Sequence, residues 1–244
     1  MKGKWILILW LCLGVASCQP SVPIGFGDLN TVAKSTLIIN YPASMQNGEI
    51  KVNENEKLGG EEQFFNPDGT LLKFSRFDKH GNHYFIDTRY YNNDGLETLT
   101  KTRIFVNNRN VVSVNRLIKE KDSIYTYLMY DEYKPHKKDT LTMVINAHDR
   151  TIYQKGELLR KNTFNEKGQL LEERYYVNNE VSIRIKKTYE DKLLMQTHMW
   201  TTNSDTVALE QYKYLQFDEQ GNWTERAYYS GGELKQVTKR AVRY

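Results

Sequence analysis

Residues 65 to 95 read FNPDGTLLKFSRFDKHGNHYFIDTRYYNNDG, and this stretch decides the fold. Three aromatic residues, Phe65, Phe77 and Tyr91, are each followed by Asn or Asp and, four positions after the aromatic residue, by Gly. Asn and Asp start turns by bonding their own backbone, and glycine takes the positive φ that closes such turns. Each unit therefore predicts a strand that ends in an aromatic residue, a tight turn and a new strand.

The same unit returns through most of the chain, at intervals of about 11 to 14 residues, the spacing of a strand plus a turn. Clear later copies are Phe164 to Gly168 and Phe217 to Gly221, and degenerate copies begin at Phe105, Tyr153, Tyr176 and Tyr229. The chain holds 17 Tyr and 9 Phe, and these residues favour strands. No sustained helical stripe of apolar residues interrupts the pattern.

Alternation within one strand indicates how the sheet is covered. Along Tyr84 to Tyr91, aromatic and polar side chains fall on both faces rather than on one. A sandwich would have one dry face. We therefore predict an all-β fold: an antiparallel meander of repeated hairpins that forms a long, twisted, largely single-layer sheet.

The repeat resembles the YD-repeat (Rhs-type) family and related exported hairpin-repeat proteins. The likeness is strongest from Phe217 to Thr224, and residues 239–244 resemble the strand that completes such a unit. The resemblance implies a structural β-repeat scaffold and brings no catalytic residues. It does not imply an enclosed toxin, because this chain is too short to surround one.

Two stretches break the rhythm of the repeat. Within residues 113–150, the segment Pro135 to Asp139 is predicted to be a polar loop, and a subdomain boundary near residue 135 stays open. The second irregular stretch runs from Met195 to Asp205. We treat both as excursions from one continuous domain that covers residues 34–244.

The start of the chain has the order of a secretory signal: Lys2 and Lys4, an apolar run from Trp5 to Val15, then small residues. The apolar run is too short to span a bilayer comfortably, which takes about 20 residues. Residues 15–18, Val-Ala-Ser-Cys, resemble the lipobox of bacterial prolipoproteins. The resemblance implies a signal peptide over residues 1–17, a lipidated Cys18, a flexible tether over residues 18–33, and a lipid anchor at the cell envelope. Gln19 in place of Asp favours the outer membrane.

Composition narrows the classes of partner and of site. The formal net charge is +4, and basic and acidic residues are interleaved, which does not predict nucleic-acid binding. The two cysteines are Cys12, inside the signal, and Cys18. A lipidated Cys18 leaves no disulfide and no cysteine-based zinc site in the mature chain.

Catalytic motifs are not evident in the sequence. His80 and His83 surround a turn, and the spacing matches no zinc signature. The carboxylates Asp68, Asp78, Asp94 and Asp218 stand at turn positions, where they are ordinary turn formers. We predict no metal, no cofactor and no enzymatic activity. The alternative is a glycosidase-type pair of carboxylates, and no feature of the sequence singles out two of them.

Aromatic residues and short sequons are the remaining candidates. An exposed aromatic platform for sugar or peptide would use Trp200, Trp223, Tyr228 and Tyr229, whereas cross-strand packing is the structural alternative. Three Asp-Ser/Thr-aliphatic triplets resemble an O-glycosylation sequon of exported bacterial proteins, with acceptors Ser123, Thr140 and Thr206. All three fall in the irregular stretches.

These observations lead to three hypotheses. The first is a non-enzymatic, envelope-tethered β-repeat scaffold that contacts another envelope protein. The second is a carbohydrate-binding lipoprotein that uses exposed aromatic residues. The third, an envelope hydrolase, has no recognisable motif behind it.

Overall fold

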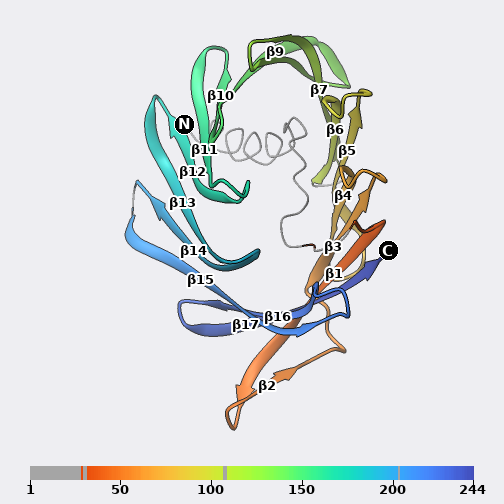
Figure 1. The fold of residues 1–244 in the computed structure, drawn as a ribbon, viewed down its shortest axis with the longest axis vertical. Coiled ribbons are helices and arrows are strands. Elements are labelled where there is room, and N and C mark those ends of the chain that lie inside the picture. Colours follow the sequence, from red (N-terminus) through yellow and green to blue (C-terminus); the bar gives the residue numbers. More distant parts are fainter. Residues whose placement is uncertain (1–28, 30–31, 107–108, 203) are drawn as a thin grey trace.

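In a computed structural model, residues 29, 32–106, 109–202 and 204–244 are described, and they form β-strands joined by short turns (Figure 1). From β3 to β17, each strand pairs antiparallel with the strand that follows it in the chain. The predicted antiparallel meander is therefore confirmed. The strands are β1 (Ser35–Gln46), β2 (Glu49–Val52), β3 (Gly59–Phe65), β4 (Leu71–Phe77), β5 (His83–Tyr91), β6 (Glu97–Val106), β7 (Arg109–Lys121), β8 (Ile124–Asp131), β9 (Lys134–Ile145), β10 (Asp149–Gln154), β11 (Glu157–Phe164), β12 (Leu170–Val177), β13 (Glu180–Glu190), β14 (Leu193–Thr201), β15 (Ser204–Phe217), β16 (Trp223–Ser230) and β17 (Glu233–Arg243).

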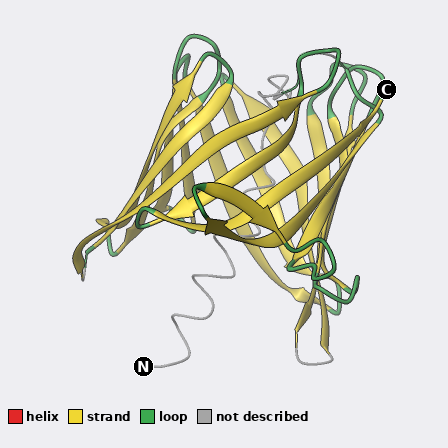
Figure 2. Ribbon diagram, turned by 90° about the horizontal axis from the view of Figure 1, so that it is seen from below, coloured by secondary structure: helices red, strands yellow, loops and turns green. Residues whose placement is uncertain are grey.

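The sheet closes on itself, which corrects the prediction of an open, twisted layer. β1 pairs on one edge with β3 and on the other with β17, from Ser35 opposite Arg243 to Pro42 opposite Gln236. The result is a single-layer antiparallel barrel of 16 strands (Figures 1 and 2). Closure removes the two free edges that an open sheet would expose.

β2 stands outside the ring of strands. It pairs with the C-terminal end of β1, from Ala43 opposite Val52 to Gln46 opposite Glu49. The two strands form a hairpin that projects from the barrel wall (Figure 1).

The turns follow the chemistry that the repeat predicts. At Asn92, the side-chain Oδ1 accepts hydrogen bonds from the backbone N–H groups of Asp94 at 3.0 Å and Leu96 at 2.8 Å. Gly95 takes a φ of 75° and donates its N–H to the Asn92 carbonyl. Turns with the same backbone bond start at Asn66, Asp78, Asn165 and Asp218. The role assigned to the Asx-x-x-Gly unit is confirmed at these five turns.

Both irregular stretches belong to strands, but their pairing is irregular: opposite β8, the register jumps from Lys138 to Lys134 and leaves residues 135–137 without a partner on that strand. Residues 135–139 belong to β9, and residues 195–201 belong to β14, which pairs with both β13 and β15. Residue 135, where the subdomain boundary was left open, lies inside β9. The polar composition of residues 134–138 has a different cause: β10 pairs with β9 from Leu141 to Ile145 and leaves this end of β9 without a strand on that side. Lysine and proline are common on such edges because they discourage pairing with other chains.

Strand pairing assigns side chains to the two faces of the barrel wall, since residues directly opposite each other share a face. One row runs across β1, β3, β4, β5 and β6 through Thr36, Gln63, Phe74, Asp87 and Thr102. This face holds most of the buried polar side chains. Side chains converge on the concave side of a curved sheet, so we take it as the inner face of the barrel.

An apolar cluster lies on the inner face where β8, β9 and β10 meet. Tyr127, Leu141, Met143 and Ile152 are each at most 1 % exposed and pack together. Burial of such side chains stabilises the wall by about 1.5–3 kcal/mol each.

No helix among the described residues is long and apolar enough to cross a membrane.

Candidate functional site

Arginine side chains stack on aromatic rings along the inner face. On β10 and β11, the Cζ of Arg150 lies 4.6 Å from the ring centroid of Phe164, and the Cζ of Arg160 lies 5.8 Å from that of Tyr175. A guanidinium that stacks on a ring keeps its in-plane N–H groups free for hydrogen bonds. The inner face therefore presents flat apolar surfaces beside fixed hydrogen-bond donors.

A second group of the same kind centres on Trp223. The Cζ atoms of Arg226 and Arg240 lie 4.4 and 3.9 Å from its ring centroid. The Cζ of Arg226 also lies 5.0 Å from the ring centroid of Tyr212, which is 5.6 Å from that of Tyr228. Both tyrosine hydroxyls donate to the Glu210 carboxylate, at 3.2 and 2.9 Å. We call Tyr212, Trp223, Arg226, Tyr228 and Arg240 the Trp223 cluster.

Near Arg150, some buried polar groups have no hydrogen-bond partner in the barrel wall. Arg150 is 5 % exposed and Asn162, directly opposite on β11, is 2 % exposed. The Nη1 of Arg150 and the Oδ1 of Asn162 are buried without a hydrogen-bond partner. Burial lowers the pKa of Arg150, and the neighbouring positive charge of Arg160 lowers it further. A buried donor without a partner costs about 1–3 kcal/mol, and more when it is charged.

A different buried charge cluster, on β5 and β6, joins an arginine to two acidic side chains, and one oxygen in it, Glu97 Oε2, is buried without a hydrogen-bond partner. The Nε of Arg89 lies 3.1 Å from Asp87 Oδ2, and its Nη1 lies 3.5 Å from Glu97 Oε2. Thr102 donates to Asp87 at 2.7 Å, and Thr100 donates to Glu97. Burial raises the pKa of Glu97 to about 8, although Arg89 opposes this change. One arginine, one carboxylate and one protonated carboxyl are together neutral, which is the form that a buried cluster favours.

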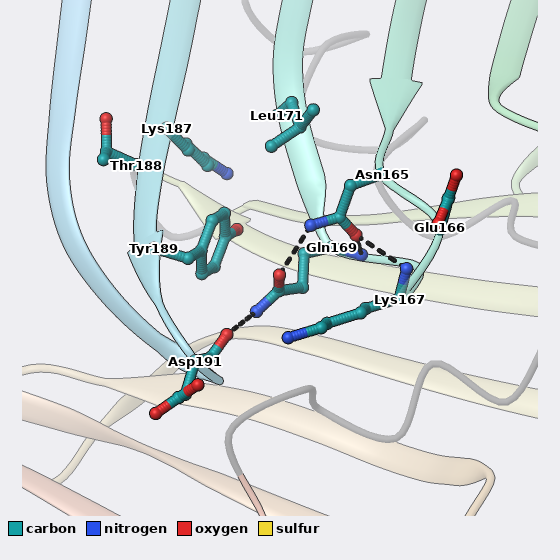
Figure 3. Close-up of a pocket in the computed structure, with 9 residues that line it drawn as sticks. All are labelled: Asn165, Glu166, Lys167, Gln169, Leu171, Lys187, Thr188, Tyr189 and Asp191. Atoms are coloured by element: carbon teal, nitrogen blue, oxygen red, sulfur yellow. Dashed lines mark hydrogen bonds between the residues drawn. The ribbon is translucent and has the colours of Figure 1, made fainter.

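An open groove of about 500 Å³ lies at the rim of the barrel, between the turn after β11 and the end of β13 (Figure 3). Gln169 crosses it and donates to the backbone carbonyl of Asp191 at 2.5 Å. Asn165 accepts the N–H of Lys167 at 3.0 Å as part of the turn. The polar atoms seen in Figure 3 thus hold two turns together. The inner face, rather than this groove, is the candidate site.

The four predicted platform residues do not form one exposed surface. Trp223 is 1 % exposed, so it is a packing residue of the Trp223 cluster and not an open platform. Tyr228 and Tyr229 lie on opposite faces, because Tyr228 pairs with Tyr212 and Tyr229 with Gln211. Trp200 is on β14, on the outer face, where it stacks on His198 with centroids 5.8 Å apart.

The sequon residues also differ from expectation in their setting. Ser123 lies in the exposed turn between β7 and β8, with a φ of 64°. Thr140 is exposed but belongs to β9, and Thr206 belongs to β15, so neither lies in an irregular loop. The side chain of Thr206 lies outside the described part of the chain, as do Cys18 and the signal segment. Lipidation of Cys18 and glycosylation of these residues stay predictions.

Metal ligands do not gather in the described ranges, where no group of three or more His, Cys, Asp or Glu side chains could hold an ion. His83 packs its ring on Phe77, with centroids 5.9 Å apart. Asp68 and Asp78 accept backbone N–H groups within their own turns. The predicted role of these carboxylates as turn formers is confirmed.

Sequence reasoning missed Arg150, Asn162 and Arg226. Each stands beside an oppositely charged or polar neighbour in the chain and reads as ordinary surface. The signal that could have found them is strand register, which places alternate residues on the inner face.

Comparison with known proteins adds little to the geometry. No family model matches the chain, and no curated protein matches it. Among solved structures, a porin-like protein from Bacteroides uniformis is 11 % identical, with a TM-score of 0.46, over 87 % of this chain and 98 % of that chain. A DUF1329 family protein from Desulfovibrio piger is 8 % identical, with a TM-score of 0.17, over 91 % and 90 %. At such scores neither structure carries an argument about this chain, and the barrel rests on the strand pairings.

Proposed function

We propose that the protein is a non-enzymatic, envelope-tethered binding protein whose barrel takes a carbohydrate on its inner face. The observation that carries the proposal is the Trp223 cluster. Sugars bind to proteins through the faces of aromatic rings and through planar polar groups that hydrogen-bond their hydroxyls. Tyr212, Arg226 and Tyr228 are half-buried and supply both kinds of contact within one patch.

The outer face supports a barrel that stands beside the membrane rather than in it. Its strands carry ion pairs such as Arg184 with Glu172 and, at 3.7 Å, Lys239 with Glu225. A barrel embedded in lipid carries an apolar outer band instead, in which a lysine or arginine costs about 2–4 kcal/mol at mid-membrane depth. A lipid on Cys18 would then tether a folded domain at the envelope, in agreement with the signal in the sequence.

The carbohydrate hypothesis is tested by titrating the protein without residues 1–17 with a panel of envelope glycans, with calorimetry as the readout. We expect binding to a subset of the panel, weakened at least about tenfold by Arg226→Gln, as is typical when a partner of a charged hydrogen bond is removed. Trp200→Phe, on the outer face, is the matched control and leaves affinity unchanged. A flat titration across the whole panel contradicts the proposal.

A protein scaffold is the second candidate, and the β1–β2 hairpin is the observation that favours it. The hairpin projects from the wall (Figure 1), and Met45 near its tip is 51 % exposed. Crosslinking in intact cells tests this candidate. A near-stoichiometric protein partner that is lost when Met45 is replaced by Asp supports it, and capture that ignores this change contradicts a role for the hairpin.

A hydrolase has less support than either binding role. Two acidic residues that could act as an acid and base, Asp87 and Glu97, are both engaged by Arg89 and accept the hydroxyls of Thr102 and Thr100. A general acid must reach the proton acceptor of its substrate within about 3 Å. Release of reducing ends from any glycan that binds contradicts the non-enzymatic part of the proposal.

A further inference from the structure

Arg150 is a buried cation that forms no ion pair with the described residues of the barrel wall. It lies on β10 on the inner face, stacked on Phe164, with Ile145 on one side and Asn162 on the other. Among the described residues, no carboxylate lies within 4 Å of its guanidinium. Burial of a cation without an opposing charge is strongly unfavourable, so a structural role alone does not explain an arginine here.

The carboxylates on neighbouring strands are engaged elsewhere. Asp149 precedes Arg150 but binds Lys161 at 3.1 Å and Thr163 at 2.9 Å. Glu173, on β12, binds Lys187 at 3.0 Å and accepts the hydroxyl of Tyr175 at 3.0 Å. Arg160 sits diagonally from Arg150 and adds a second positive charge, which the charge of Glu173 partly offsets. This part of the inner face therefore carries excess positive charge.

We propose that Arg150 forms a subsite for the acidic substituent of a sugar ligand, a carboxylate or a phosphate ester, and that the Oδ1 of Asn162 accepts a hydroxyl of the same sugar. A guanidinium matches both groups through two parallel N–H bonds, and charged bonds of this kind are about twice as strong as neutral ones. The Cζ of Arg150 lies 4.6 Å from the Phe164 ring centroid, and its Nη1 has no hydrogen-bond partner in the wall that would compete with the anion. The subsite rests on the proposed carbohydrate function and narrows it to acidic glycans.

The ligand role and a structural role predict opposite effects on stability. If Arg150 supports the fold, its replacement by Met lowers Tm. If Arg150 binds an anionic ligand instead, Arg150→Met removes an unpaired buried charge from the free protein, and the Tm of the free protein rises by about 2–4 °C. A shift of this size corresponds to about 1 kcal/mol in a domain of this length. Arg103→Gln, an exposed arginine on the outer face, is the matched control and leaves Tm unchanged.

Binding is measured by calorimetry on the protein without residues 1–17, with an oligogalacturonide and its methyl ester as acidic and neutral versions of one ligand. Wild type is expected to bind the acid at least about tenfold more tightly than the ester, the ratio that one charged hydrogen bond supplies. Arg150→Met abolishes this preference but still binds the ester, whereas Asn162→Leu weakens the acid and the ester alike. A phosphorylated sugar, run beside the acid, identifies which anion is preferred.

Several outcomes overturn the subsite. An unchanged acid-to-ester ratio in Arg150→Met, or a lower Tm with unchanged binding, assigns Arg150 to structure. Tight ester binding without preference for the acid leaves the carbohydrate function and removes the subsite. If neither oligomer binds, the carbohydrate function fails, and the anion site is then tested by measuring Tm with and without sulfate. A sulfate-induced rise in Tm of wild type that is absent in Arg150→Met retains the anion site. Equal Tm values of wild type with and without sulfate remove it.

Discussion

Glu97 provides a sharp test of the buried charge cluster, because its pKa is raised from 4.5 to about 8 by burial. The folded protein then holds this proton more tightly than the unfolded chain, so the contribution of Glu97 to stability is fully present below its unfolded pKa and is lost as the pH rises through about 8. Each unit of pKa difference corresponds to about 1.4 kcal/mol. Between pH 5 and pH 9, Glu97 alone is expected to lower the free energy of unfolding by about 4 kcal/mol.

The perturbation is Glu97→Gln, which keeps the shape of the side chain and fixes its charge at zero. At pH 5 the variant should match wild type within about 1 kcal/mol, since both carry a neutral group beside Arg89. At pH 9 it should be more stable than wild type by up to about 4 kcal/mol, because wild type must then unfold or bury a second negative charge next to Asp87.

Urea denaturation at pH 5, 7 and 9 measures this difference, with tryptophan fluorescence as the readout. Glu132→Gln is the matched control: Glu132 binds Lys101 at 2.9 Å on the surface, with 42 % of its side chain exposed. Exposed pairs contribute about 1 kcal/mol or less, so this variant should follow wild type at every pH. Parallel pH profiles of wild type and Glu97→Gln, or equal destabilisation of Glu97→Gln at pH 5 and pH 9, would refute a raised pKa at Glu97.

Three further predictions concern the wall and its surface. Gly60→Ala should lower the free energy of unfolding by about 3 kcal/mol in urea denaturation, because the new Cβ on β3 would collide with the backbone carbonyl of Ile38 on β1. Gly48→Ala, with open space around it, should lower it by about 1 kcal/mol. Asn92→Ala removes two hydrogen bonds of its turn and should lower stability by about 1–2 kcal/mol in the same assay. In the protein without residues 1–17, Trp200→Phe should remove most of the iodide quenching of tryptophan fluorescence, because the tryptophan that stays is buried; retained quenching would contradict the inner position of that residue.

Local features of the fold follow from the sequence because they depend on neighbouring residues. The turn at Asn92 needs an Asx side chain, two backbone N–H groups and a glycine, all within five positions. A repeat of such turns dictates hairpins, and hairpins dictate a meander. The polar stretch at residues 135–139 misled the same reasoning, because polarity there marks the unpaired edge of β9 and not a loop.

Closure of the sheet is not encoded in any local pattern. It depends on β1 pairing with β17, where Asn40 accepts a hydrogen bond from Thr238 at 2.8 Å across almost the whole chain. An isolated edge strand of an open sheet would show the same composition. The number of strands and their curvature decide whether the two ends meet, and the repeat alone specifies neither.

The inner face escaped prediction because side-chain phase is lost at each irregularity of the strands. Register shifts occur at Ile152, Thr163 and Tyr175, all within the three strands around Arg150. A shift of one residue moves every following side chain to the other face, so alternation counted from the sequence fails after each one. Asp149 and Arg150 illustrate the consequence. They read as an ordinary pair of neighbouring surface charges, yet the strand sends one toward Lys161 and the other inward onto Phe164. The strand thus separates a buried arginine from the acidic residue beside it in the sequence. We propose that an anionic ligand supplies the opposing charge.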